Sequence, residues 1–234
     1  SKINRGKKNR VDGSDAPDRN DEYFLYQTLL GAWPCGKTGD REFIERIKSY
    51  IVKAVREAKV HTEWLKPDLD YEEAFVNFIE ALLTPSPANR FLSELSSFAD
   101  KIAHYGALNS LSQTLLKIAS PGVPDFYQGT ELWDLSLVDP DNRRPVDFSR
   151  RREALASMAS CAGDPAVFAG ELLKTKSDGR CKLFLISRAL RTRTKHAAQF
   201  QSGEYIPLKV EGRFRNNLVA FARRTSDDWA VAVA

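Results

Sequence analysis

The sequence lacks a long hydrophobic run, since no stretch approaches the roughly 18 apolar residues of a membrane-spanning helix. Its opening residues, SKINRGKKNRVDGSDAPDRND, are polar and lack the apolar core of a secretory signal peptide. Cysteine is scarce, because Cys35, Cys161 and Cys181 are widely spaced and form no CxxC pair. These absences argue against a membrane, disulfide-stabilised or zinc protein. They predict a reduced, cytoplasmic protein with no metal and no other cofactor.

A strong excess of charge of one sign is also missing. The net charge is +4, and basic residues cluster only in 5–8 (RGKK) and 188–195 (RALRTRTK). No nucleic-acid-binding motif accompanies these clusters, and no aromatic residues are interleaved with them. The composition therefore predicts neither nucleic acid nor membrane as a partner.

Helical periodicity dominates the first half of the chain. Apolar residues recur at helical spacing, and Asp40 is a suitable N-cap for the second helix. Gly106 is expected to divide the last of these segments into two helices. The predicted helices cover residues 22–30, 40–59, 71–84 and 88–119.

The second half changes its pattern twice. The segment 122–129 (GVPDFYQG) is short and bounded by glycines, which predicts a buried strand that enters a loop. Helices are predicted over 149–162, 165–174 and 182–198, and alternating residues after 199 predict antiparallel strands. The last strand stops at Ala234 without a closing turn, which indicates a piece of a longer protein.

The segment between residues 120 and 148 concentrates side chains that suit sugar binding. Aromatic faces stack on sugar rings, whereas carboxylates and arginines bind vicinal hydroxyl groups. On composition alone, a solvated and turn-rich connection is the simpler interpretation. The side chains of interest are Asp125, Tyr127, Glu131, Trp133, Asp134, Asp139, Asp141, Arg143 and Arg144.

Family resemblance changes that interpretation. GVPDFYQGTEL resembles the G-x-P-x-x-Y-x-G-x-E pattern at the eighth barrel strand of the α-amylase superfamily, and DPDNRRPVDF resembles the loop that follows. Together with DRNDEYFLYQTLLGAWP and VREAKVHTEWLKPDLDYEEAF, these segments resemble the maltooligosyltrehalose synthase family. The resemblance covers residues 11–233.

The resemblance implies a mostly α fold with a small β portion, the C-terminal part of an α-amylase-type (β/α)8 barrel enzyme. Residues 1–20 would be a polar linker or mobile segment, and 21–120 a helical insertion before strand eight. Residues 121–198 would hold strand eight, its substrate loop and closing helices. Residues 199–234 would begin a truncated C-terminal β domain.

The implied activity is an isomerisation in trehalose biosynthesis. The family converts the reducing-end α-1,4 linkage of maltooligosaccharides to α,α-1,1 through a retaining glycoside hydrolase type of mechanism with three carboxylates. Those carboxylates lie near barrel strands four, five and seven, which this chain lacks. No catalytic residue is therefore assigned here, and the missing N-terminal barrel becomes an expected partner. Self-association through surfaces that this barrel would cover is also expected.

The resemblance assigns substrate-binding residues instead. The Asp-x-x-x-Arg spacing places Asp139 and Arg143 on the donor-side sugar. Residues after the predicted strand line the cleft, and residues in VHTEW lie beside the acceptor sugar, with helix-loop packing as the alternative. These last two groups are Tyr127, Glu131 and Trp133, and His61 and Trp64.

Two other functions stay open. One is a non-catalytic helical carbohydrate-binding or interaction module, and the other is an ordinary hydrolase or transglycosidase of the same superfamily. An upstream reading frame that encodes barrel strands with three carboxylates would favour the synthase. A natural start codon close to Ser1 would favour the module.

The purified 234-residue chain is expected to be inactive on maltopentaose, because it lacks the three carboxylates that the mechanism requires. The measurement is the formation of non-reducing product over a long incubation. Turnover by the purified chain would contradict this expectation.

Overall fold

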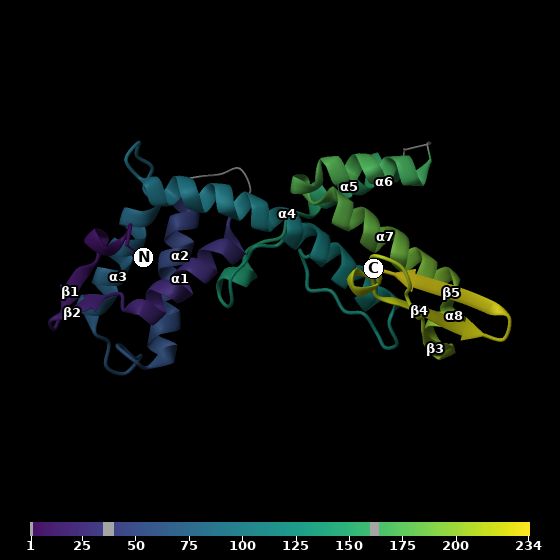
Figure 1. The fold of residues 1–234 in the computed structure, drawn as a ribbon, viewed down its shortest axis with the longest axis horizontal. Coiled ribbons are helices and arrows are strands. Elements are labelled where there is room, and N and C mark those ends of the chain that lie inside the picture. The colour runs from purple at the N-terminus through teal and green to yellow at the C-terminus, as the bar shows by residue number, and fades with distance from the viewer. Residues whose placement is uncertain (1, 35–39, 160–163) are drawn as a thin grey trace. The chain divides into compact units, whose positions relative to one another are not determined.

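The computed structural model describes residues 2–34, 40–159 and 164–234. The chain is mostly helical with a small β portion, as the sequence predicts (Figure 1). Within the described residues this portion consists of two small antiparallel sheets, of which the N-terminal one was not predicted. It divides into two compact units. The first contains residues 1–104 and 135–144, and the second contains residues 105–134 and 145–234. Among the described helices, none combines the length and hydropathy needed to cross a membrane.

The first unit consists of a small hairpin followed by helices. Three of the helices begin at an aspartate whose side chain accepts a hydrogen bond from a backbone N–H of the first turn: Asp18, Asp40 and Asp68. The elements are η1 (Arg5–Lys7), β1 (Asn9–Val11), β2 (Ser14–Ala16), α1 (Arg19–Ala32), α2 (Arg41–Ala58), α3 (Leu69–Leu83) and the first half of α4 (Arg90–Ala119).

The core of the first unit forms where α1, α2 and α3 bring their apolar faces together. Ile47 and Ile51 on α2 are fully buried, and so are Phe78 and Leu82 on α3. These residues recur every three to four positions, so each helix presents one continuous apolar stripe. This periodicity explains why the sequence predicts α2 and α3 almost to their ends.

Residues 2–18 form ordered structure rather than the predicted polar linker or mobile segment. β1 pairs with β2, and Asn4 and Ala16 are completely buried. The Lys8 ammonium forms an ion pair with Glu22 on α1 at 2.8 Å and donates a hydrogen bond to the Pro17 carbonyl. The segment is rich in polar residues, so its sequence resembles that of a linker. The prediction was wrong because the fold buries some of these polar groups, including the Lys8–Glu22 ion pair.

The second unit contains the rest of α4, further helices and a three-stranded sheet. Arg193 on α7 donates hydrogen bonds to the carbonyls of Ile118, Ser120 and Gly122, which ties α7 to the C-terminal end of α4. The other elements are η2 (Asp141–Arg143, in the first unit), α5 (Phe148–Ala159), α6 (Pro165–Lys174), η3 (Lys176–Asp178), α7 (Arg180–Lys195) and α8 (Ala197–Ser202).

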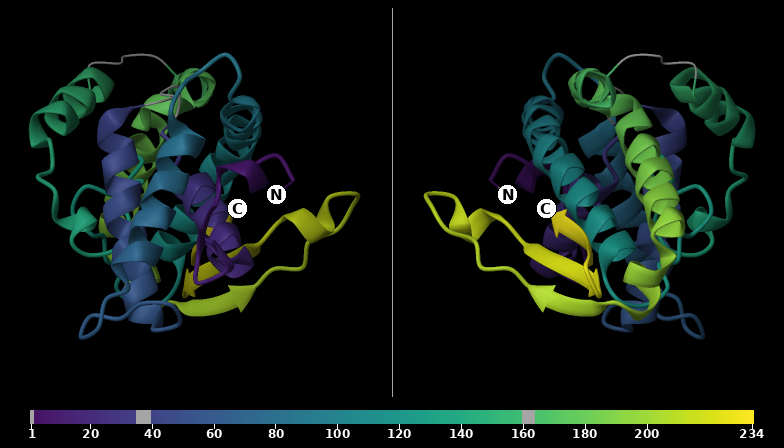
Figure 2. Two further views of the ribbon diagram at one scale, coloured as in Figure 1. Left: turned by 90° about the vertical axis from the view of Figure 1, so that its left-hand side faces the viewer. Right: turned by 90° about the vertical axis from the view of Figure 1, so that its right-hand side faces the viewer.

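The sheet of the second unit has the order β3–β4–β5, and all of its pairs are antiparallel. Phe221 and Ala232 on its inner face pack with Phe200 of α8 and Ala119 of α4. The connection between β3 and β4, residues 208–219, extends beyond the strands (Figure 2). The three strands that the sequence predicts after residue 199 are confirmed as β3 (Glu204–Pro207), β4 (Ala220–Thr225) and β5 (Asp228–Val233), with η4 (Arg215–Asn217) before β4.

Two local predictions were wrong. α4 runs without a break through Gly106, because a single glycine lowers helix stability without ending the helix. Residues 122–129 contain no strand, since no described strand pairs with them.

Two glycines of the second unit are expected to respond oppositely to alanine. Gly106→Ala should raise the free energy of unfolding by about 0.5–1 kcal/mol, because the residue lies inside a helix and a Cβ there meets no atom within 4 Å. Gly179→Ala should lower it by about 1–3 kcal/mol. Gly179 has a φ of +82°, and its Cβ would lie 3.0 Å from the Trp133 backbone nitrogen. Urea unfolding of both variants measures the two changes in the free energy of unfolding. Equal changes would contradict the expected difference between the two glycines.

Candidate functional site

The loop 135–144 of the first unit is anchored to α2 by one arginine. Arg46 donates from Nε and Nη2 to the two carboxylate oxygens of Asp141, each at 2.8 Å, and Nη2 also donates to the Leu135 carbonyl at 3.0 Å. Asp141 accepts a further hydrogen bond from the Leu137 N–H at 2.7 Å. Only 17% of the Arg46 side chain and 13% of the Asp141 side chain are exposed. This bidentate, largely buried pair therefore fixes the path of the loop.

The ionisation of Asp141 depends on these partners. Burial by itself would raise the pKa of the carboxyl group, but the hydrogen bonds from Arg46 and from the Leu137 N–H outweigh it. The pKa of Asp141 is consequently lowered. The anchor is thus an ionised carboxylate at neutral pH.

Asp139 and Arg143, the predicted donor-side pair, lie on the outer surface of the anchored loop. Their side chains form an ion pair and are 50% and 73% exposed. Lys53 on α2 donates a hydrogen bond to the Asp139 carbonyl at 2.6 Å, which holds the backbone at this position. The pair therefore combines an accessible carboxylate and guanidinium with a fixed backbone.

The loop 59–68, which carries His61 and Trp64, is held by a second arginine of α2. Arg56 donates to both carboxylate oxygens of Glu72 at 2.7 and 2.6 Å, and Thr62 donates to the same carboxylate. The Arg56 guanidinium also lies 5.0 Å from the centre of the Trp64 ring, which is about half exposed. Glu72 thus anchors this loop.

His61 belongs to a polar cluster that the sequence did not reveal. Its Nε2 atom lies 2.9 Å from Asp18 Oδ2, and its ring stacks on Tyr71 with the ring centres 4.3 Å apart. The Tyr71 hydroxyl donates to Asp21 at 2.5 Å. Burial raises the pKa of Tyr71, and the hydrogen bond to Asp21 raises it further.

The candidate ligand atoms of Asp18, Asp21 and His61 lie within 4.8 Å of one another. Each group already makes a hydrogen bond within the protein, and Asp18 is also the N-cap of α1. The only sequence signal was the carboxylate spacing Asp18-x-x-Asp21, which is typical of a helix start. Interactions within the protein account for this arrangement.

In the second unit, two of the three predicted residues are held by hydrogen bonds. Glu131 forms an ion pair with Arg151 of α5 at 2.8 Å, and Arg151 also donates to the carbonyls of Gly129 and Asp147. The Trp133 indole N–H donates to the Lys176 carbonyl at 2.6 Å. Glu131 therefore supports the turn at 127–131, and Trp133 has a fixed ring orientation.

Tyr127 is the most accessible of the predicted residues near this turn, and Lys182 is a partly buried neighbour of Trp133. Tyr127 is about half exposed, and its carbonyl accepts hydrogen bonds from Thr130. The Lys182 ammonium lies 5.6 Å from the centre of the Trp133 ring. Burial lowers the pKa of Lys182, and the nearby charge of Lys117 lowers it further. The predicted substrate residues of this unit therefore adjoin a cationic side chain that the sequence analysis did not select.

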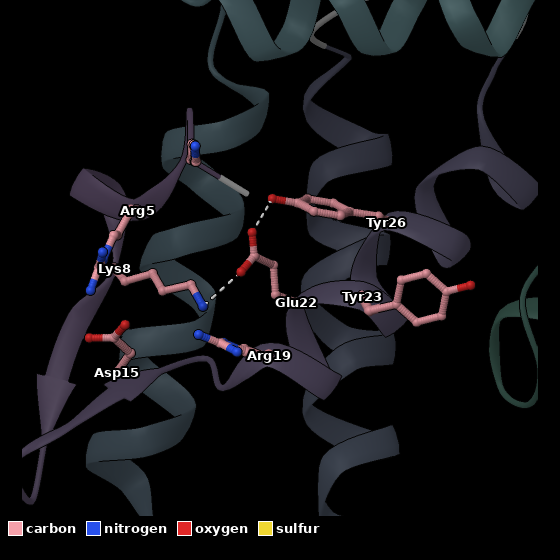
Figure 3. A pocket seen from close by; sticks show the side chains of 8 residues that line it. Arg5, Lys8, Asp15, Arg19, Glu22, Tyr23 and Tyr26 are labelled. Carbon is pink, nitrogen blue, oxygen red and sulfur yellow. Dashed lines mark hydrogen bonds and ion pairs between the residues drawn. The ribbon is translucent and has the colours of Figure 1, made fainter.

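A separate hollow of about 570 Å³ opens beside the hairpin of the first unit. Figure 3 shows Glu22 on its wall between Lys8 and Tyr26, with interactions to both. None of the seven predicted substrate-binding residues lines this hollow. Its lining residues are Lys2, Arg5, Lys8, Asp15, Arg19, Glu22, Tyr23 and Tyr26.

The predicted residues are shared between the units. His61, Trp64, Asp139 and Arg143 belong to the first unit, whereas Tyr127, Glu131 and Trp133 belong to the second. Each group is described within its own unit. A single cleft that contains all seven residues stays a prediction.

Comparison with known proteins confirms the family resemblance. A curated protein of Mycobacterium tuberculosis (strain H37Rv) that carries the name maltooligosyl trehalose synthase is 35% identical over 218 residues. The match covers 93% of this chain and 25% of that protein. The chain therefore spans about a quarter of the length of the curated relatives it matches. No family model matches the sequence.

Solved structures agree with this relationship. A crystal structure of a maltooligosyl trehalose synthase is 38% identical, has a TM-score of 0.77, and aligns with 88% of this chain and 26% of its own. The maltooligosyltrehalose synthase of Arthrobacter ramosus is 34% identical with a TM-score of 0.73, over 91% of this chain and 25% of its own. Nearly the whole chain thus resembles one quarter of these proteins in both sequence and fold.

The two carboxylates of the loop 135–144 are expected to differ in their effect on stability. Asp141→Asn should lower the free energy of unfolding by about 2–3 kcal/mol at pH 7, because it leaves Arg46 buried without its charge partner. Asp139→Asn should lower it by less than about 1 kcal/mol, since its ion pair is exposed. Urea unfolding followed by circular dichroism measures both values, and equal losses would contradict the assignment of Asp141 as the anchor.

The stability loss caused by Asp141→Asn should become smaller at acidic pH. The pKa of Asp141 is lower in the folded chain than the value of about 3.9 for an unfolded aspartate. Its stabilising contribution is therefore complete above about pH 5 and declines as the pH falls through the lowered pKa. The difference in free energy of unfolding between the unaltered chain and Asp141→Asn should therefore become smaller in that acidic range. Urea unfolding at a series of pH values measures this difference.

Proposed function

We propose that this chain is the C-terminal part of a maltooligosyltrehalose synthase and supplies residues of its substrate cleft. The observation that carries the proposal is the match to enzymes of this name over nearly the whole chain, in sequence and in fold. The chain would contribute the helical insertion, the segment at the eighth barrel strand and the start of a C-terminal β domain.

The complete enzyme would isomerise the reducing-end α-1,4 linkage of a maltooligosaccharide to α,α-1,1. A carboxylate outside this chain would form the covalent intermediate, and a second would act as acid and then as base. The released glucose would turn within the site and attack through its anomeric hydroxyl in place of water. This outcome requires an acceptor site that holds the sugar and excludes water.

The pair Asp139 and Arg143 suits the donor side of such a cleft. The carboxylate accepts and the guanidinium donates hydrogen bonds, so together they can bind neighbouring sugar hydroxyls. The backbone of their loop is held by Lys53 and by the Arg46–Asp141 pair. A binding pair on a fixed backbone loses little freedom when sugar binds.

The second unit would supply an aromatic wall. The Trp133 ring is oriented by its hydrogen bond to Lys176, and Tyr127 presents an exposed ring. Glu131 would act mainly through the turn that it holds with Arg151. Exposed and oriented aromatic rings offer apolar faces on which sugar rings pack.

His61 and Trp64 would lie on the acceptor side. Trp64 exposes about half of its surface, and His61 is oriented by Asp18 and Tyr71. An aromatic face beside an oriented imidazole suits a glucose that must be retained and turned. This assignment depends on the same fold relationship as the donor-side pair.

Kinetics in the full-length enzyme test the donor-side assignment. Asp139→Ala and Arg143→Ala should each lower kcat/KM for maltopentaose isomerisation about 10- to 100-fold, because each removes charged hydrogen bonds to the sugar. The matched control is the pair Arg90 and Glu94 of α4, which forms a similarly exposed ion pair at the same four-residue spacing. Arg90→Ala and Glu94→Ala should leave kcat/KM within about twofold. Unchanged rates for both loop variants would remove the assignment.

A further inference from the structure

Lys53 joins α2 to the loop 135–144 at the position of Asp139. It follows Arg46 by seven residues, about two helical turns, so both side chains leave α2 on the same face. The Lys53 ammonium donates a hydrogen bond to the Asp139 carbonyl at 2.6 Å, and only 23% of the side chain is exposed. The carboxylate of Glu57 lies 3.7 Å from the same ammonium, so the contact to the loop is the shorter of the two.

Arg46 and Lys53 hold different parts of the loop. Arg46 contacts the Leu135 carbonyl and the Asp141 carboxylate, and neither of these contacts includes Asp139 or Arg143. The side chains of Asp139 and Arg143 are 50% and 73% exposed, and an exposed ion pair contributes little to its own order. Lys53 instead acts directly on the backbone from which the Asp139 side chain extends.

We propose that Lys53 is a positioning residue for the donor-side sugar. The inference rests on the function proposed above for Asp139 and Arg143. A hydrogen bond from an ammonium group is stronger than one between neutral groups, so it restrains the direction of the Asp139 carbonyl. That restraint orients the carboxylate and, through the ion pair, the Arg143 guanidinium. Without it, the sugar would have to order the pair when it binds, and its affinity would fall.

Lys48 offers a matched comparison on the same helix. Its side chain is 13% exposed, and it forms ion pairs with Glu45 of α2 and Glu80 of α3. Both partners lie outside the loop 135–144. Removing Lys48 therefore takes charged contacts from α2 and leaves the contact between Lys53 and the loop in place. The two lysines thus separate a loss of stability from a loss of loop positioning.

Steady-state kinetics of the full-length enzyme with maltopentaose test the assignment. Lys53→Met, which removes the donor and keeps a long side chain, should raise KM about five- to tenfold and leave kcat within about twofold. Lys53→Arg retains a charged donor and should bring KM back to within about twofold of the unaltered enzyme. Lys48→Met should leave KM within about twofold, although urea unfolding should show a lower stability. An unchanged KM for Lys53→Met, or an equal rise for Lys48→Met, would overturn the inference.

A combined variant separates this inference from the proposed function. In a background that carries Asp139→Ala and Arg143→Ala, Lys53→Met should change kcat/KM by less than about twofold, because its effect passes through the two deleted side chains. A full effect in that background would mean that Lys53 acts elsewhere, and the inference would be wrong. If Asp139→Ala and Arg143→Ala leave kcat/KM unchanged, the donor-side function fails and the inference falls with it. If they lower kcat/KM and Lys53→Met does not, the inference alone fails.

Discussion

The bidentate contact between Arg46 and Asp141 is the interaction on which the candidate site of the first unit depends. It joins residues 95 positions apart and fixes the loop 135–144 on α2. The loop carries Asp139 and Arg143 on its outer side, so a buried ion pair supports an exposed one. Buried and paired charges cost much to separate, whereas exposed charges exchange water for a ligand readily. The two pairs therefore suit different roles, structural and binding.

Three other arginines of the described chain make similar contacts. Arg56 holds the segment around Glu72, Arg151 holds the turn at Glu131, and Arg193 holds the end of α4. A guanidinium offers several donors in one plane, so a single side chain can satisfy both a carboxylate and nearby carbonyls. Loops rich in proline and glycine have few backbone partners of their own, and these arginines supply them. The proposed sugar-binding residues thus rest on positions that helices determine.

Much of the helical structure could be predicted from local pattern. The spacing of Ile47 and Ile51 predicted α2, and Asp40 predicted its start, because periodicity and capping act over a few residues. The strand predicted over 122–129 was wrong because a strand depends on distant residues. It exists only where another strand pairs with it. Gly106 shows a third limit, because a local preference of about 1 kcal/mol does not outweigh the hydrogen bonds of a long helix.

The mostly helical architecture, the final three strands and the relationship to maltooligosyltrehalose synthases could all be predicted from the sequence. The different roles of the two carboxylates in Asp139-Pro-Asp141 follow from the fold, in which Asp141 anchors the loop and Asp139 is exposed. The fold also brought His61 beside Asp18 and Tyr71. Identity and spacing are local properties, whereas burial depends on what a distant segment places against each side chain. For Asp141 the distant segment is α2, which supplies Arg46. For His61 it is the start of α1, where the capping residue Asp18 lies.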